Sequence, residues 1–139
     1  MMYTSPPGTR LRVLVADDDN EMRAFIVEAL RASGCTTVEA SDGDEVLSML
    51  SEAIDSPELR PDVIVADVKM PHLSGFGVLA ALRRASWRLP VVMITVVSEA
   101  SIHTVARRLG AVGVLHKPFD PADLVTAVWN AKAASALQH

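Results

Sequence analysis

Hydrophobic positions along the chain follow two alternating patterns. Short runs rich in apolar and β-branched residues are typical of strands, and longer stretches with an apolar residue every three or four positions are typical of helices. The predicted strands cover 12–16 (RVLVA), 36–40 (TTVEA), 63–66 (VIVA), 90–95 (PVVMIT) and 112–116 (VGVLH). The predicted helices follow each strand in turn, over 20–33, 44–54, 76–85, 99–109 and 120–137.

Five strand–helix pairs in succession predict a parallel sheet with helices on both faces. A strand that is buried on both faces is apolar throughout, whereas an edge strand need not be. The strands at 12–16, 63–66 and 90–95 are therefore expected in the centre, and the more polar ones at 36–40 and 112–116 at the edges. This distribution fits the order 2-1-3-4-5, that of a flavodoxin-like, doubly wound (βα)5 three-layer sandwich.

Composition narrows the class of protein. The chain has 139 residues, half of them hydrophobic, which suffices for one domain with a real core. The net charge of −4 and the lack of a basic run argue against direct nucleic-acid binding, and no apolar stretch is long enough to span a membrane. The first nine residues lack the apolar core of a signal peptide and predict a disordered tail before a domain over 10–137. The single cysteine, Cys35, excludes an internal disulfide and fits the cytoplasm.

Polar side chains stand where four of the predicted strands end. Asp17 and Asp18 follow the first strand, Asp67 the third, Thr95 ends the fourth, and Lys117 follows the fifth. Ligands of such sheets bind at the carboxyl ends of the strands, at the switch point between the first and third. We therefore expect three carboxylates to converge on one crevice, with a hydroxyl and an ammonium nearby.

Three converging carboxylates require a cation to balance their charge. An all-oxygen site suits a hard divalent ion, above all Mg²⁺, which also favours phosphate oxygens. An aspartate can itself accept a phosphoryl group, so the pattern indicates phosphoryl transfer to a carboxylate. Asp19 is predicted to cap the following helix instead of binding metal. The histidines His72, His103 and His116 look scattered, which argues against a histidine metal site.

Four segments in this order, VLVADDD, PDVIVADVKMPHLSG, VVMIT and HKPF, carry a family resemblance. From Arg10 to Leu137 the chain resembles the receiver domain of two-component response regulators, of the chemotaxis-regulator type. The resemblance implies a signalling switch fed by a histidine kinase or histidine phosphotransfer protein, and not an enzyme that turns over other substrates. It also assigns roles to the matching residues: Asp67 as phosphoryl acceptor, Asp17, Asp18 and the carbonyl of Lys69 as further Mg²⁺ ligands beside Asp67, Thr95 as switch hydroxyl, and Lys117 as the conserved-type lysine.

The chain departs from the family pattern at two positions. Val96 stands where the family usually has Ala or Gly, and is expected to narrow the approach to Asp67. Val114 stands where the family usually has a Tyr or Phe ring that moves on activation, so a ring switch is absent. The Lys117–Pro118 bond is expected to be cis, which would aim the ammonium into the crevice.

The resemblance also implies a docking surface, on which the receiver would pair with a second copy. It lies on 99–109, 112–116 and 120–137, with His103, Arg107, Leu115 and Trp129 as candidate contacts.

Two other functions remain open at this point. One is a fold-conserving interaction module that works without phosphorylation, which Val96 and Val114 would favour. The other is a phosphohydrolase of the haloacid-dehalogenase type, whose first motif Asp17-x-Asp19 superficially fits, although Glu21 departs from it. The sequence names neither the kinase nor the output, and the chain is either a stand-alone regulator or a piece of a longer protein.

Overall fold

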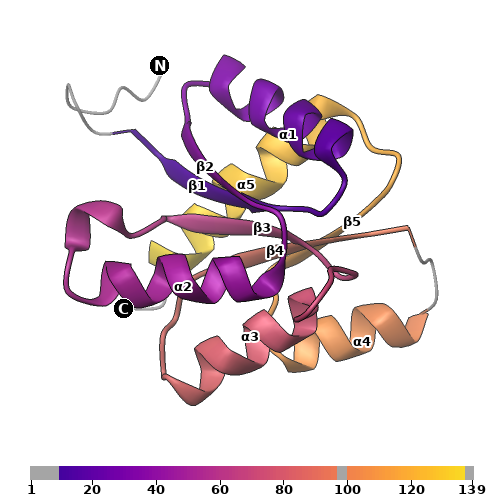
Figure 1. Cartoon of the computed structure of the whole chain (residues 1–139). Coiled ribbons are helices and arrows are strands. Elements are labelled where there is room, and N and C mark those ends of the chain that lie inside the picture. Colours follow the sequence, from indigo (N-terminus) through magenta and orange to yellow (C-terminus); the bar gives the residue numbers. More distant parts are fainter. Residues whose placement is uncertain (1–9, 97–99, 137–139) are drawn as a thin grey trace.

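A parallel sheet forms the centre of the molecule (Figure 1). The computed structural model describes residues 10–96 and 100–136. Its five-stranded sheet has the order β2-β1-β3-β4-β5, and every neighbouring pair is parallel. The strands are β1 (Arg12–Ala16), β2 (Thr36–Ala40), β3 (Val63–Asp67), β4 (Val91–Thr95) and β5 (Gly113–His116).

Helices cover both faces of this sheet. They are α1 (Asn20–Ala32), α2 (Gly43–Ile54), α3 (Gly75–Arg84), α4 (Ala100–Arg108) and α5 (Pro121–Ala136). Helices α1 and α5 lie together on one face, and α2, α3 and α4 on the other (Figure 1). The predicted fold class and strand order are therefore confirmed.

The sheet separates two hydrophobic cores because its side chains alternate between the faces. Val13 and Val15 of β1 point to the α1/α5 core, and Leu14 points to the α2/α3/α4 core. All five positions of β3 and of β4 are buried, as the apolar runs predicted for central strands. The carboxyl end of β3 therefore lies deep between two other strands.

The element boundaries differ from the predicted ones by one residue or so. Strand β3 includes Asp67, because its neighbour Val68 still donates its N–H to the carbonyl of Ile94 on β4. A short 3₁₀ helix over Pro57–Leu59 was not predicted. Residues 1–9, Glu99 and Leu137 lie outside the described residues, so the predicted tail and these helix ends stay predictions. Among the described helices, none has the length and apolarity needed to cross a membrane.

Two local signals in the sequence correctly mark helix ends. Asp19 caps α1, since its carboxylate accepts the N–H groups of Glu21 and Met22. Gly34 and Gly110 follow α1 and α4 with φ angles of 95° and 94°, in the left-handed region that favours glycine. The cap of α1 leaves Asp19 facing its own helix.

Gly75, the first residue of α3, is packed directly against the end of β3. A Cβ atom at this position would lie 2.4 Å from the carbonyl oxygen of Asp67 and 2.5 Å from the terminal methyl of Met93. The Gly75 N–H also donates to the carbonyl of Val68. Only glycine allows the helix to approach this closely.

We expect Gly75→Ala to lower the free energy of unfolding by about 1–3 kcal/mol, because the added methyl group must displace backbone. Gly113→Ala is the matched control, since its Cβ would meet nothing closer than 3.9 Å. Urea unfolding followed by circular dichroism measures both. Equal stability of the two variants would contradict the close packing of α3 on β3.

Candidate functional site

Three carboxylates meet at the carboxyl edge of the sheet. Asp17 and Asp18 directly follow β1, and Asp67 is the last residue of β3, the strand beside it. One carboxylate oxygen from each lies within 4.8 Å of the others. Asp17 and Asp67 are buried, whereas Asp18 is exposed, so the cluster is open to solvent on one side. The predicted convergence of the three carboxylates is confirmed.

The Lys117 ammonium lies between the two buried carboxylates. Its Nζ atom is 2.9 Å from Oδ2 of Asp17 and 2.6 Å from Oδ2 of Asp67. The three side chains are at most 12% exposed, so solvent screens these pairs weakly. Lys117 follows the edge strand β5. Its ammonium therefore links the carboxyl ends of β1, β3 and β5.

Burial and hydrogen bonds with neighbouring groups shift the pKa of Asp17 in opposite directions, and the same holds for the pKa of Lys117. Burial raises the pKa of Asp17 above its usual value, although the Asp19 N–H and the Lys117 ammonium favour its ionised form. Burial alone would lower the pKa of Lys117, but the hydrogen bonds and charges of Asp67 and Asp17 outweigh it, and the pKa is raised. The lysine is therefore held in its charged form by the carboxylates.

Backbone groups fix the orientation of both buried acids. The Asp19 N–H donates to Oδ1 of Asp17, and the Lys69 N–H donates to Oδ1 of Asp67, each at 2.9 Å. The second oxygen of each acid faces Lys117. Lys69 is thus placed in the loop beside Asp67, where the sequence predicted a ligand from its carbonyl.

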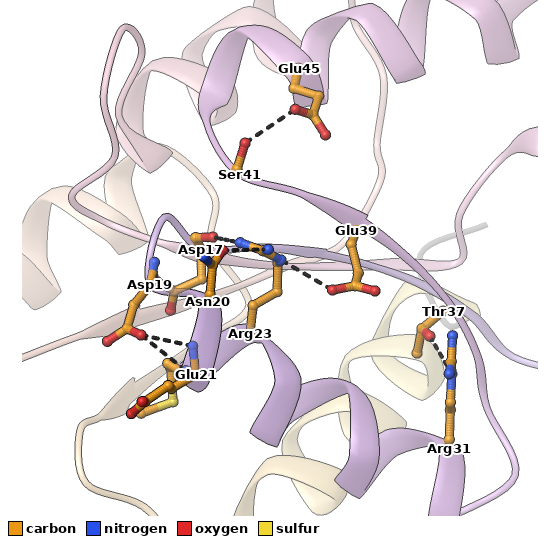
Figure 2. A network of polar contacts seen from close by, with 11 residues as sticks. Asp17, Asp19, Asn20, Glu21, Arg23, Arg31, Thr37, Glu39, Ser41 and Glu45 are labelled. Atoms are coloured by element: carbon orange, nitrogen blue, oxygen red, sulfur yellow. Dashed lines mark hydrogen bonds and ion pairs between the residues drawn. The ribbon is translucent and has the colours of Figure 1, made fainter.

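Arg23 of α1 supports the loop after β1, and sequence reasoning missed it (Figure 2). Its guanidinium donates to the backbone carbonyl of Asp17 at 2.7 Å and to the side chain of Asn20 at 2.7 Å. It also pairs with Glu39 of β2 at 3.1 Å. An arginine one turn into a helix that begins beside an acidic loop could have suggested such a contact, but so could many solvated arginines.

Thr95 ends β4 beside the acids and is buried. In the sheet register Ile94 is the partner of Asp67, and Thr95 is the partner of His116. The Lys117 N–H donates to the Thr95 carbonyl at 2.8 Å. The Lys117–Pro118 bond is cis, as predicted. The structure therefore brings Thr95 and Lys117 to the same edge as the three carboxylates.

The two valines that depart from the family pattern have different surroundings. Val96 follows Thr95 and is 65% exposed, at the rim of the site. Val114 of β5 packs partly against the α2/α3/α4 core. It also lines a cavity of about 160 Å³ between α4 and β5, together with His103, Arg107 and three smaller residues.

The expectation that the histidines are scattered is wrong for two of them. The rings of His103 on α4 and His116 on β5 are in contact, with centroids 4.7 Å apart. His72 lies elsewhere, with Nδ1 at 3.1 Å from the carboxylate of Asp42, the cap of α2. The sequence could not show this pairing, because helical and strand positions 13 residues apart have no fixed relation.

The donor set of the carboxylate cluster suits a hard divalent cation. It offers oxygen atoms only, and one of the three acids is open to solvent, where an ion could keep water ligands. Three carboxylates and one ammonium leave a local charge of −2 when all are ionised. A divalent ion would neutralise this charge.

A family model described as response regulator receiver domain matches residues 13–129. The chain belongs to this family. It is a receiver domain of the two-component kind, and its acidic cluster fits the phosphorylation site of such domains. Receiver domains generally bind Mg²⁺ at an acidic pocket and partner with histidine kinases or phosphotransfer proteins.

Known receivers are similar in both sequence and structure. The transcriptional regulatory proteins PrrA and PdtaR of Mycobacterium tuberculosis are 38% and 39% identical over 120 residues, which are 86% and 84% of this chain and 49% and 54% of theirs. The Francisella response regulator 1452 receiver domain has a TM-score of 0.82 and 29% identity, over 91% of this chain and 99% of that one. The chemotaxis response regulator CheY4 of Vibrio cholerae has a TM-score of 0.76 and 31% identity, over 88% of this chain and 99% of that one.

The chain spans about half the length of the curated relatives that it matches. These relatives are transcriptional regulators as whole proteins, so the predicted lack of direct nucleic-acid contact has no support from them and stays a prediction. The predicted domain limits, 10–137, also stay a prediction.

We expect Lys117→Met to lower the free energy of unfolding by about 3 kcal/mol when divalent ions are chelated. The substitution leaves Asp17 and Asp67 buried without their cation, and the open side at Asp18 keeps the loss at the low end of the range for broken buried pairs.

The matched control is Lys132→Met, because Lys132 pairs with Asp62 at 3.1 Å but is 45% exposed. Loss of such an exposed pair costs below about 1 kcal/mol. Urea unfolding of both variants is the measurement. A Lys117 variant as stable as the Lys132 variant would show that the ammonium does not balance the buried acids.

Proposed function

We propose that Asp67 is the residue of this receiver that becomes phosphorylated, with a phosphohistidine of a kinase or phosphotransfer protein as donor. One observation carries the proposal. Asp67 lies with Asp17 and Asp18 in one cluster, and the ammonium of Lys117 contacts its carboxylate at 2.6 Å. Asp17 is buried more deeply than Asp67 and Asp18 is exposed, so Asp67 is an enclosed acid next to the solvent-open side of the cluster.

The proposed step transfers one phosphoryl group between two side chains. A carboxylate oxygen of Asp67 attacks the phosphorus, an acyl phosphate P–O bond forms, and the P–N bond to the donor imidazole breaks. The electron pair of that bond stays on the imidazole nitrogen. Because the donor ring carries a proton on its other nitrogen, it leaves as a neutral histidine. Release from the receiver is hydrolysis of the same acyl phosphate by water, which returns the carboxylate and inorganic phosphate.

Neighbouring residues would position the group and balance its charge. Lys117 can move its hydrogen bond from the carboxylate to a phosphoryl oxygen, and the Thr95 hydroxyl is the group that would bind another. Asp17, Asp18, Asp67 and the carbonyl of Lys69 would hold Mg²⁺. When bound, Mg²⁺ would offset the negative charge that the carboxylates and the phosphoryl oxygens share.

The surface formed by α4, β5 and α5 is our proposed site for pairing with a second receiver. Trp129 on α5 is an exposed apolar residue of these elements. Neither this homodimer nor the predicted cytoplasmic location is tested by the fold, and both stay predictions.

We expect acetyl phosphate with Mg²⁺ to add one phosphoryl group to the chain and none to Asp67→Asn, because the amide lacks the nucleophilic oxygen. Intact-protein mass spectrometry measures the added mass. The matched control is Asp19→Asn, which removes one carboxylate from the same loop but keeps a good helix cap. It should be labelled like the parent chain.

Labelling of Asp67→Asn at the parent level would refute the assignment. A parent chain that takes no phosphoryl group from any donor would favour the phosphorylation-independent interaction module. The phosphohydrolase alternative has no support from the family match over 13–129.

We expect Val96→Ala to be labelled faster than the parent chain, because Val96 stands at the rim of the site and its two methyl groups narrow the approach. We state a direction only, since the exposed side chain can rotate aside in part. The rate of mass gain with acetyl phosphate is the measurement. Val112→Ala removes the same atoms from an exposed valine at the opposite edge of the sheet and should leave the rate unchanged. If Val96→Ala is labelled at the same rate as the parent chain and Val112→Ala, crowding of the site by Val96 is ruled out.

A further inference from the structure

Two imidazole rings from different elements meet on the α4/β5 surface, and neither belongs to the carboxylate cluster. His103 on α4 and His116 at the end of β5 bring their Nε2 atoms to 2.5 Å from each other. The rings meet through their Nε2 edges, with centroids 4.7 Å apart and an interplanar angle of 28°, and both are half-buried. Their Nε2 lone pairs therefore face one small volume between α4 and β5.

We propose that His103 and His116 form a second metal site, for a borderline divalent ion such as Zn²⁺, with water in the remaining positions. Imidazole nitrogen is a ligand that Zn²⁺, Ni²⁺ and Cu²⁺ prefer, whereas Mg²⁺ prefers carboxylate and water oxygens. The site is thus chemically distinct from the carboxylate cluster. It does not depend on phosphorylation of Asp67.

The observed geometry needs only a small adjustment to hold an ion. Two Zn–N bonds of about 2.0–2.1 Å place the nitrogens about 3 Å apart at a right angle and about 3.4 Å apart at a tetrahedral angle. The nitrogens must therefore separate by less than about 1 Å, and the rings must turn so that each Nε2 lone pair points at the ion instead of at the other ring. The cavity of about 160 Å³ that His103 lines gives its ring room for this movement. That space exists beside Val114, whose small side chain leaves it unfilled.

Proton balance also permits binding. In the contact without metal, one ring donates its Nε2 proton to the bare Nε2 of the other. To bind an ion through both Nε2 atoms, the donor ring must carry its proton on Nδ1 instead. The change is a tautomer shift through solvent, and no net proton leaves a neutral pair.

The charge around the pair limits its affinity. Arg107 lines the same cavity one helical turn after His103, and its guanidinium repels a cation. The residues that line this cavity include no carboxylate. We therefore expect a site weaker than one with three or four protein ligands, and Arg107→Gln to tighten it.

Calorimetric titration of the full chain with Zn²⁺, in excess Mg²⁺ to occupy the carboxylates, tests the proposal. We expect one ion per chain, with the Zn²⁺ affinity reduced by at least about tenfold in His103→Gln and in His116→Gln. Loss of a residue that only hydrogen-bonds to a metal ligand already lowers affinity by about tenfold, and loss of the ligand itself should lower it at least as much. His72→Gln and His139→Gln are the matched controls, and neither should change the affinity. Parent-like binding in both site variants, or a loss confined to a control, would overturn the site.

A second measurement covers the case in which a variant does not fold. Nitrogen chemical shifts of the imidazole rings in the parent chain show directly which nitrogens Zn²⁺ binds. Of the four histidines, two should show a metal-bound Nε2 resonance, assigned to His103 and His116. Unshifted Nε2 resonances of these two rings at saturating Zn²⁺ would refute the proposal.

Discussion

The contact of one ammonium with two buried carboxylates is the interaction on which the functional edge of the sheet depends. Lys117 reaches Asp17 and Asp67 from the strand at the sheet edge, across the end of β4. Without a cation between them, two acids at the ends of adjacent strands would repel each other in a poorly screened environment. The parallel order of β1, β3, β4 and β5 thus brings repelling carboxylates together at the same place where it forms a binding site.

The fold could be predicted from sequence because its signals are repeated. Each central strand is apolar at consecutive positions, and helices α1 to α4 each have a clear apolar face, so an error at one boundary leaves the topology unchanged. The strand order then placed Asp17, Asp67, Thr95 and Lys117 at one edge without any knowledge of side-chain contacts. The 3₁₀ turn at Pro57–Leu59 was missed because a single turn has no periodicity to detect.

Contacts that depend on side-chain volume or direction could not be predicted. The role of Gly75 follows from how closely the backbone of α3 approaches β3, since a Cβ atom at this position would lie 2.4 Å from the Asp67 carbonyl oxygen, and no sequence pattern encodes this. The contact of His103 with His116 depends on how α4 sits over β5, which the periodicity of neither element reveals. Arg23 likewise reaches the Asp17 carbonyl only because α1 starts so soon after β1.

The two edges of the sheet are each joined to a lysine–aspartate pair, and the pairs differ in how they respond to the solution. At the amino edge, Asp62 accepts the Arg12 N–H and pairs with the half-exposed Lys132 of α5. Mobile ions reach that exposed pair and weaken it as the salt concentration rises. At the carboxyl edge, Lys117 is shielded from such ions by the protein around it. Monovalent salt thus weakens the pair of Asp62 and Lys132 more than the two contacts of the enclosed Lys117.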